Sequence, residues 1–235
     1  MVNDQGDEDR QDLTVVRDDF WTSTSNKQLA FIQHVKTILK VTGRTAVVVP
    51  DNVLFEGGAG EIVRRKLLHE CDVHTLLRLP TGIFYAQRVK ANVLFFDRRP
   101  ASKTAQTSKL WVYDLRTNMH FTLKTNPLKR ADLDDFVACY NPSNRHDRRA
   151  TWDAKKNPNG RWRHYDFKEL VARDKASLDV FWLKDDALEA SANLPAPHLI
   201  AAEIVEDLRA ALEAFEGLEA ALSIADSASR AVTPD

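Results

Sequence analysis

The chain has 235 residues, 43% of them hydrophobic, which is enough to bury the core of one or two domains. Its two cysteines, Cys71 and Cys139, show no partner pattern, which argues against a disulfide scaffold or a zinc site. No apolar run approaches the ~20 residues of a membrane helix, and the acidic N-terminus does not resemble a signal peptide. We therefore expect a soluble, cytoplasmic protein that has no contact with a membrane.

The formal net charge of −1 conceals an uneven distribution of charge along the chain. Residues 1–20 contribute −5 and residues 185–235 contribute −9, which leaves residues 21–184 at +13. Acidic ends on a basic body indicate a surface that faces a polyanion, with separate solvated or partner-facing tails. A scattered, solvated surface is the alternative.

The first elements in chain order indicate a helix followed by a strand. Residues 1–19 are polar and without periodicity, so we expect a loop or disordered lead-in. Apolar residues at helical spacing predict a helix over residues 25–40, with Asn26 among its possible caps. The β-branched run within residues 44–50 predicts a strand that is covered on both faces, as in a parallel sheet.

The next elements complete an α/β pattern. Residues 61–70 are expected to form a helix, and residues 73–79 and 91–96 two further strands. A glycine cluster at residues 57–60 precedes the helix, but residues 51–56 separate it from the preceding strand. We therefore interpret the glycines as a hinge or a helix start rather than a phosphate-binding loop. This order of elements predicts the closing half of a doubly wound α/β sheet.

Beyond residue 110 the pattern changes. We expect residues 110–115 and 120–123 to form a short antiparallel pair, residues 133–140 a short helix, and residues 141–168 a stretch rich in turns. A long helix is predicted over residues 198–224. The resulting division is a lead-in (1–19), a partial α/β domain (20–100), a mixed extension (101–194) and a C-terminal helical segment (195–235).

The last helix carries a narrow apolar seam in steps of three and four residues. This pattern favours docking to another subunit, and packing against its own domain is the alternative. The candidate docking residues are Ile204, Leu208, Phe215, Leu218 and Leu222.

The loop at residues 79–87 joins two buried strands and contains two adjacent aromatic residues. Phe84 and Tyr85 follow Gly82, and Gln87 ends the loop. Aromatic rings on a loop at the edge of a sheet can stack a nucleotide base outside its helix. The alternative is that both rings cap the core.

Residues 141–168 hold eight basic and three acidic residues, with aromatic residues between them. Such a mixture is typical of a surface that follows a nucleic-acid backbone, and a solvated loop is the alternative. The candidate DNA contacts are Arg145, Arg148, Arg149, Lys155, Lys156, Arg161 and Arg163. Catalytic motifs such as Gly-x-Ser-x-Gly or His-Glu-x-x-His are absent, and the seven histidines lack the spacing of metal ligands.

Several segments resemble, in the same order, the modification (methyltransferase) subunit of type I restriction-modification systems. They are residues 24–34, 43–55, 79–87, 91–97 and 111–116. The resemblance implies a class I, Rossmann-like methyltransferase sheet that transfers a methyl group from S-adenosylmethionine to adenine N6 in duplex DNA. It also implies as partners a specificity subunit, a second modification subunit and a restriction subunit.

The sequence departs from this family in one respect. It contains no Pro-Pro dipeptide, so the catalytic Asn/Asp-Pro-Pro-Phe/Tyr motif is missing, and the cofactor-binding loop is expected upstream of Met1. We therefore expect a C-terminal fragment that has no catalytic or cofactor-binding residue of its own and is inactive alone. The alternative is a non-catalytic module that binds DNA or the specificity subunit. The strand at residues 45–49 is expected to lack a neighbour that the missing half supplies, which leaves an edge prone to association.

Overall fold

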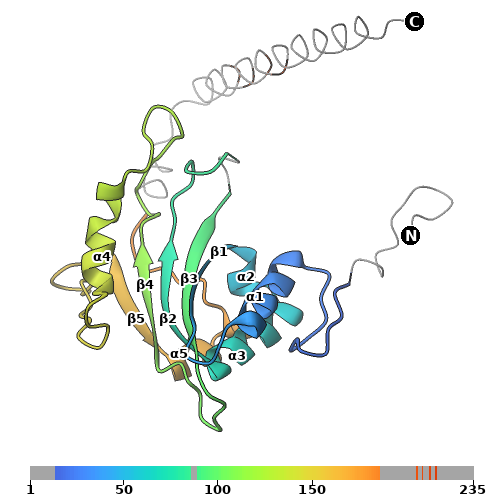
Figure 1. Ribbon diagram of the computed structural model, residues 1–235. Coiled ribbons are helices and arrows are strands. Elements are labelled where there is room, and N and C mark those ends of the chain that lie inside the picture. The colour runs from blue at the N-terminus through green and yellow to red at the C-terminus, as the bar shows by residue number, and fades with distance from the viewer. Residues whose placement is uncertain are drawn as a thin grey trace, which may run out of the picture. The chain divides into compact units, whose positions relative to one another are not determined.

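A computed structural model describes residues 14–85 and 89–185, together with Val205, Leu208, Leu212 and Phe215. The chain forms two compact units, Met1–Lys184 and Asp185–Asp235, which are considered separately. The first unit is a five-stranded sheet with helices on both faces (Figure 1). This α/β arrangement confirms the expected fold class.

The sheet has the strand order β1-β3-β2-β4-β5. Its elements are α1 (Lys27–Ile38), β1 (Arg44–Pro50), α2 (Asn52–Phe55), α3 (Ala59–Glu70), β2 (Cys71–Arg78), β3 (Ala91–Arg98), β4 (Lys109–Asp114), the 3-10 helix η1 (Arg130–Leu133), α4 (Asp134–Tyr140), β5 (Trp162–Asp166), α5 (Phe167–Ala172) and the 3-10 helix η2 (Asp174–Ala176). Strand β3 is antiparallel to both β1 and β2, whereas β2 and β4 are parallel. Strands β1, β2 and β4 therefore run in one direction.

One predicted pairing is wrong. Strand β4 does not form a hairpin with residues 120–123 but joins the main sheet, parallel to β2 and antiparallel to β5. Strand β5 lies in the stretch expected to consist of turns, and its Trp162 and Tyr165 are buried. Burial of these two large rings stabilises the strand, although the polar residues Arg163 and His164 lie between them. The sheet consequently continues beyond residue 100, where the first domain was expected to end.

Local sequence signals explain the starts of the two long helices. The side-chain oxygen of Asn26 accepts hydrogen bonds from the backbone N–H groups of Gln28 and Leu29, at 2.9 and 3.3 Å, and so caps α1 as predicted. Gly58 precedes α3 with φ of 56°, a left-handed value that glycine adopts without strain. The glycine cluster is therefore a helix start, one of the two roles expected for it.

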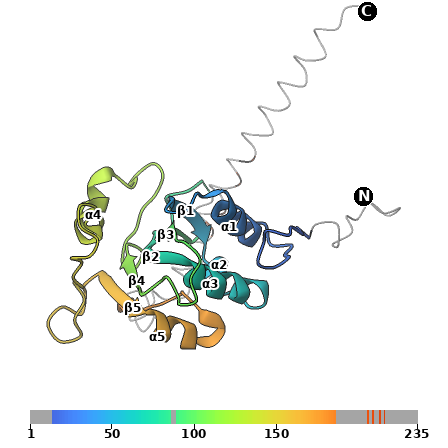
Figure 2. The same cartoon turned by 60° about the horizontal axis from the view of Figure 1, so that its bottom comes forward.

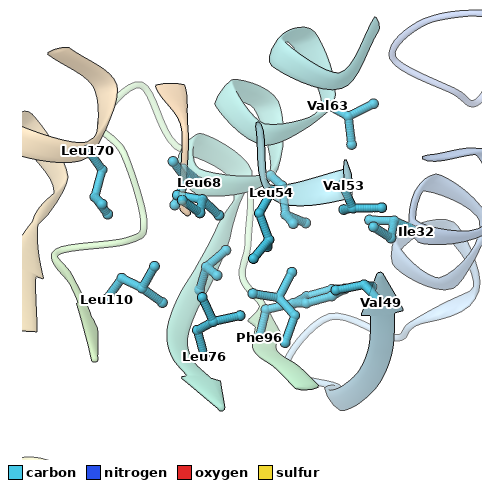
Figure 3. Close-up of a cluster of buried hydrophobic side chains, with 14 of the residues drawn as sticks. Ile32, Val49, Val53, Leu54, Val63, Leu68, Leu76, Phe96, Leu110 and Leu170 are labelled. Carbon is cyan, nitrogen blue, oxygen red and sulfur yellow. The ribbon is translucent and has the colours of Figure 1, made fainter. Parts of the chain in front are cut away.

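Two hydrophobic clusters cover the two faces of the sheet. Helices α1, α2 and α3 lie on one face and α4 on the other (Figure 2). The first cluster joins Ile32 and Leu54 to Leu76 and Phe96 of the sheet (Figure 3). The second cluster packs α4 against the opposite face of the same strands. Because both faces of β2 are covered, this central strand is almost fully buried.

Strand β1 differs from the expectation of burial on both faces. It lies at the edge of the sheet and, within the described part of the chain, pairs with β3 alone. Val47 and Val49 are buried beneath the helices, whereas Val48, which points to the other face, is 55% exposed. The difference arises because α4 covers the far half of the sheet and does not reach β1.

Candidate functional site

The carboxyl ends of three parallel strands meet at one edge of the sheet. Pro50 at the end of β1 pairs with Ala91 at the start of β3. Arg78 at the end of β2 pairs with Asn92 of β3 on one side and with Asp114 at the end of β4 on the other. Ligands of open α/β sheets bind at this kind of edge. The fold therefore favours a functional site here, and we call this part of the sheet the carboxyl edge.

A polar cluster organises the carboxyl edge. The guanidinium of Arg116 donates two hydrogen bonds to the carboxylate of Asp51, at 2.8 and 2.9 Å. Asn92 donates a further hydrogen bond to Asp51, at 2.7 Å. Burial alone would raise the pKa of Asp51, but the hydrogen bonds from Arg116 and Asn92 outweigh burial and hold the pKa below its usual value. The cluster thus holds an ionised carboxylate in place.

The same arginine positions the loop at residues 79–87. The Nε atom of Arg116 donates to the carbonyl oxygen of Leu79 at 3.0 Å, and Nη2 donates to the carbonyl oxygen of Ala91 at 3.1 Å. These two residues begin and follow the loop, so one side chain holds both of its ends. Sequence reasoning missed this cluster, although Asp51 and Arg116 each follow directly on a predicted strand.

The loop separates its two aromatic residues. Phe84 is half-buried against the second hydrophobic cluster, whereas Tyr85 is 97% exposed. Gly82 has φ of +82°, and a Cβ atom there would lie 1.9 Å from the carbonyl oxygen of Phe121. The close approach of two backbones thus requires glycine. Of the alternatives weighed from the sequence, capping of the core describes Phe84 but not Tyr85; Gln87 lies outside the described residues.

A second arginine anchors the chain after η2 to the carboxyl edge. Arg78 is fully buried, forms an ion pair with Asp179 at 3.0 Å and donates to the carbonyl oxygen of Val180. Its guanidinium also lies 4.1 Å from the centre of the Phe181 ring. The ion pair with Asp179 balances the buried charge of Arg78, although its Nε atom has no hydrogen-bond partner among the described residues.

The basic stretch does not form one surface. Arg161 donates to the carbonyl oxygens of Asp114 and Thr117, and Arg163 lies 4.2 Å from the centre of the Trp152 ring. Arg145 forms an ion pair with Asp97, and Arg148 is buried. The expected candidates that project into solvent are Arg149, Lys155 and Lys156. The sequence could not show this division, because Arg145 and Arg161 find their partners, Asp97 and Asp114, in distant segments.

The second unit contributes a few positions to the described structure. Leu208 and Phe215, both predicted docking residues, are helical and exposed, as are Val205 and Leu212. Their spacing of three and four residues places them on one side of a helix. The other docking candidates, Ile204, Leu218 and Leu222, lie outside the described residues.

The described residues hold neither a metal-binding group of side chains nor a reactive thiol. Among the residues that the structure describes, no group of His, Cys, Asp or Glu is arranged to hold a metal ion. Burial raises the pKa of the Cys71 thiol to about 12 and that of Cys139 to about 11, so neither is a reactive thiolate near neutral pH. In the same part of the chain, no helix is both long and apolar enough to cross a membrane.

Comparison with known proteins identifies the family. A sequence model of the N-6 DNA methylases matches residues 5–170. The chain belongs to this family. It is 42% identical to the methylase subunits of the type I restriction enzymes EcoKI of Escherichia coli strain K12 and StySJI of Salmonella typhimurium strain LT2. Each alignment covers 87% of this chain and 43% of the relative, so the chain spans less than half the length of these proteins.

Solved structures show the same relationship. The crystal structure of the EcoKI M protein matches with a TM-score of 0.63 and 39% identity, over 88% of this chain and 46% of that protein. A structure from a study of complex assembly in a type I restriction-modification system matches with a TM-score of 0.56 and 25% identity, over 89% of this chain and 43% of that one. The sheet is thus a Rossmann-like methyltransferase sheet in part, as the sequence predicted.

Membership of this family implies the use of S-adenosylmethionine, but the glycines at residues 57–60 do not fit a cradle for it. A Cβ atom on Gly57 would lie 3.3 Å from the side chain of Lys175. Arg64 donates to the carbonyl oxygens of Val53, Glu56 and Lys175 beside the same helix start. Side chains of the chain itself therefore lie against Gly57 and Gly60, whereas the space at Gly58 is open. The arginine that holds this helix start is structural, and no chemical step is assigned to the glycines.

Proposed function

We propose that this chain is part of an adenine-specific DNA methyltransferase, the modification subunit of a type I restriction-modification system. The complete enzyme would transfer a methyl group from S-adenosylmethionine to adenine N6 in duplex DNA. The observation that carries the proposal is the match to a type I modification subunit over nearly nine-tenths of the chain, in both sequence and structure. The same match supports this function over the alternative, a non-catalytic module that binds DNA or the specificity subunit.

In this proposal the chain holds the target base rather than performing the chemistry. The exposed ring of Tyr85 lies on the loop at the carboxyl edge, and Arg116 fixes the ends of that loop. A base that is flipped from the duplex is held by stacking and by hydrogen bonds to its edge. Stacking on an aromatic side chain contributes about 1–3 kcal/mol per base. Tyr85 is thus our candidate platform for the adenine, with Gln87 as a candidate for contacts to its edge.

The free edge of β1 is where the remainder of the enzyme would join. Its outer backbone groups have no strand partner within the described residues, and Val48 is exposed beside them. An apolar cleft of 280 Å³ runs along the same strand between Phe31 and residues 48–50. An unpaired strand with apolar side chains readily pairs with another chain. We therefore place the neighbouring strand of the full sheet here.

The remaining surfaces fit the partners of such a subunit. Exposed Arg149, Lys155 and Lys156 would contact the backbone of duplex DNA. The apolar side chains of Leu208 and Phe215 would dock to the specificity subunit or to a second modification subunit, and a restriction subunit would join the complex.

Methyl transfer from labelled S-adenosylmethionine to DNA tests this proposal. The assay contains a specificity subunit and either the 235-residue chain alone or the chain with the N-terminal half of a related modification subunit. We expect activity only in the second mixture. Activity of the chain alone would refute the assignment of roles. Binding to the specificity subunit without methyl transfer in any mixture would favour the non-catalytic module.

A further inference from the structure

A polar pocket of 330 Å³ lies at the end of the sheet opposite the carboxyl edge. Its walls include Asp72 and His74 at the start of β2, Arg99 after β3, and Trp111 near the start of β4. Asp72 and Arg78 are six residues apart on β2, so at about 3.3 Å per residue the pocket lies roughly 20 Å from the carboxyl edge. The pocket is therefore distinct from the proposed base-binding loop.

Four cationic side chains line the pocket, and three of them have a carboxylate partner. Arg99 lies 2.9 Å from Asp72, Arg145 lies 2.6 Å from Asp97, and Lys109 lies 3.9 Å from Asp166. The fourth is Arg148, and no carboxylate within the described part of the chain lies within 4.0 Å of it. One net positive charge therefore remains in the pocket, and it belongs to Arg148.

Arg148 is unusual because it is only 9% exposed. Its Nε atom donates to the carbonyl oxygen of Tyr140 at 2.8 Å, and Nη1 donates to the hydroxyl of Thr75 at 3.1 Å. Its Nη2 atom is buried and has no hydrogen-bond partner among the described residues, and the same is true of Nη1 of Arg145. Burial of a guanidinium without a counter-ion destabilises the fold, so binding of an external anion beside it would be favourable.

The histidine in the wall does not supply a competing charge. Burial, assisted by the charge of Arg145, lowers the pKa of His74 to about 4, so its imidazole is neutral near pH 7. Asp97 opposes an anion, but Arg145 and Arg99 lie at 2.6 and 3.8 Å from its carboxylate and offset its charge. The positive potential of the pocket thus comes from its guanidinium groups.

We propose that this pocket binds a phosphate group, from a free mononucleotide or from a DNA backbone, through the guanidinium groups of Arg145 and Arg148, which both line it. Two guanidinium groups in the wall of one pocket match the oxygens of a phosphate. The volume of 330 Å³ falls within the usual range of small-molecule sites, roughly 300–1,000 Å³, and Trp111 adds an aromatic wall for a base. Arg145 and Arg148 thereby act in one pocket rather than on the open surface expected from the sequence.

Titration calorimetry of the full chain with sodium phosphate tests the proposal at constant ionic strength, with sodium chloride as the reference. Lys109→Gln removes a charge from the wall of the pocket at a half-exposed position. Arg130→Gln removes an exposed charge that does not line the pocket. We expect Lys109→Gln to weaken phosphate binding about three- to tenfold and Arg130→Gln to leave it unchanged. Arg148→Met should weaken binding more than tenfold, with its fold checked by circular dichroism.

The source of the phosphate is distinguished in the same experiment. Tighter binding of 5′-AMP than of inorganic phosphate, with quenching of tryptophan fluorescence that Trp111→Leu removes, indicates a mononucleotide. Displacement of bound phosphate by a short DNA duplex, lost in Lys109→Gln but kept in Arg130→Gln, indicates the DNA backbone. Absence of phosphate binding, or equal weakening by Lys109→Gln and Arg130→Gln, would overturn the proposal. These readouts do not involve methyl transfer, so failure here leaves the proposed function standing.

Discussion

Replacing Arg116 with alanine isolates the contribution of the polar cluster at the carboxyl edge. The side chains of Arg116 and Asp51 are only 13% and 19% exposed. Breaking a fully buried ion pair costs roughly 3–5 kcal/mol, and this partial exposure lowers our expectation to about 2–3 kcal/mol for the free energy of unfolding. The cost is high because Asp51 remains charged and keeps Asn92 as a donor but loses both hydrogen bonds from the guanidinium.

Urea unfolding at pH 7, followed by tryptophan fluorescence, measures this difference. Arg130→Ala is the matched control, because its ion pair with Asp134 is 67% exposed on both sides and should contribute less than about 0.5 kcal/mol. The double variant Asp51→Asn/Arg116→Ala should lose less stability than the sum of the single variants, by about 1–2 kcal/mol. Equal effects of Arg116→Ala and Arg130→Ala, or strict additivity, would refute the reasoning.

The same pair has a defined pH dependence. Because the folded protein holds the pKa of Asp51 below its usual value, the pair stabilises the fold above the unfolded-state pKa of about 3.9. This contribution is lost as the pH falls through the lower pKa of the folded state. The stability difference between the wild type and Arg116→Ala should therefore narrow below about pH 4.

Three further substitutions test other features of the structure. Gly82→Ala should destabilise the fold by about 2–4 kcal/mol in urea, because a Cβ atom would meet the carbonyl oxygen of Phe121; an unchanged midpoint would contradict this. Tyr85→Ala should change the free energy of unfolding by less than about 0.5 kcal/mol but lower kcat/KM roughly tenfold in the complemented methylation assay. Phe84→Ala should instead lower the free energy of unfolding, because Phe84 packs against the second hydrophobic cluster. Val48→Lys should reduce self-association on size-exclusion chromatography, since a charge on an edge strand opposes pairing. Leu123→Lys, at a 40% exposed position on the loop after β4, should not.

Three strands of the sheet were expected within a few residues of their observed bounds. Strands β1 and β3 each contain four apolar residues in succession, which need burial on a sheet. Strand β2 was also expected, although His74 and Thr75 interrupt its apolar residues. Strand β5 was missed because two of its five residues are charged and its buried positions, Trp162 and Tyr165, are three apart. Arg163 covers the rings of Trp152 and Tyr165, and the sequence gives no sign of that packing.

The candidate site was predictable to a similar extent. The position of the loop between two strands was expected from the sequence, but the separation of its rings was not: each alternative treated Phe84 and Tyr85 alike, and only Tyr85 is exposed. The role of each arginine could not be predicted, because a guanidinium serves equally well against a carbonyl oxygen, a carboxylate or a phosphate. Arg148 and Arg149 illustrate this limit: they are neighbours in sequence, yet one is buried and the other is 87% exposed at its side chain.

The two hydrophobic clusters indicate how this chain could combine with a separate N-terminal half of the enzyme. Strand β2 is covered on both faces and has strand partners on both sides, so the centre of the sheet does not depend on anything outside the described residues. Of the two edge strands, β1 and β5, it is β1 that combines an uncovered row of backbone groups with an exposed apolar side chain, Val48. Complementation would then require the addition of a strand at one edge rather than the refolding of a core. Val48→Lys should accordingly weaken methyl transfer in the complemented assay while leaving the free energy of unfolding of this chain within about 0.5 kcal/mol of the wild type.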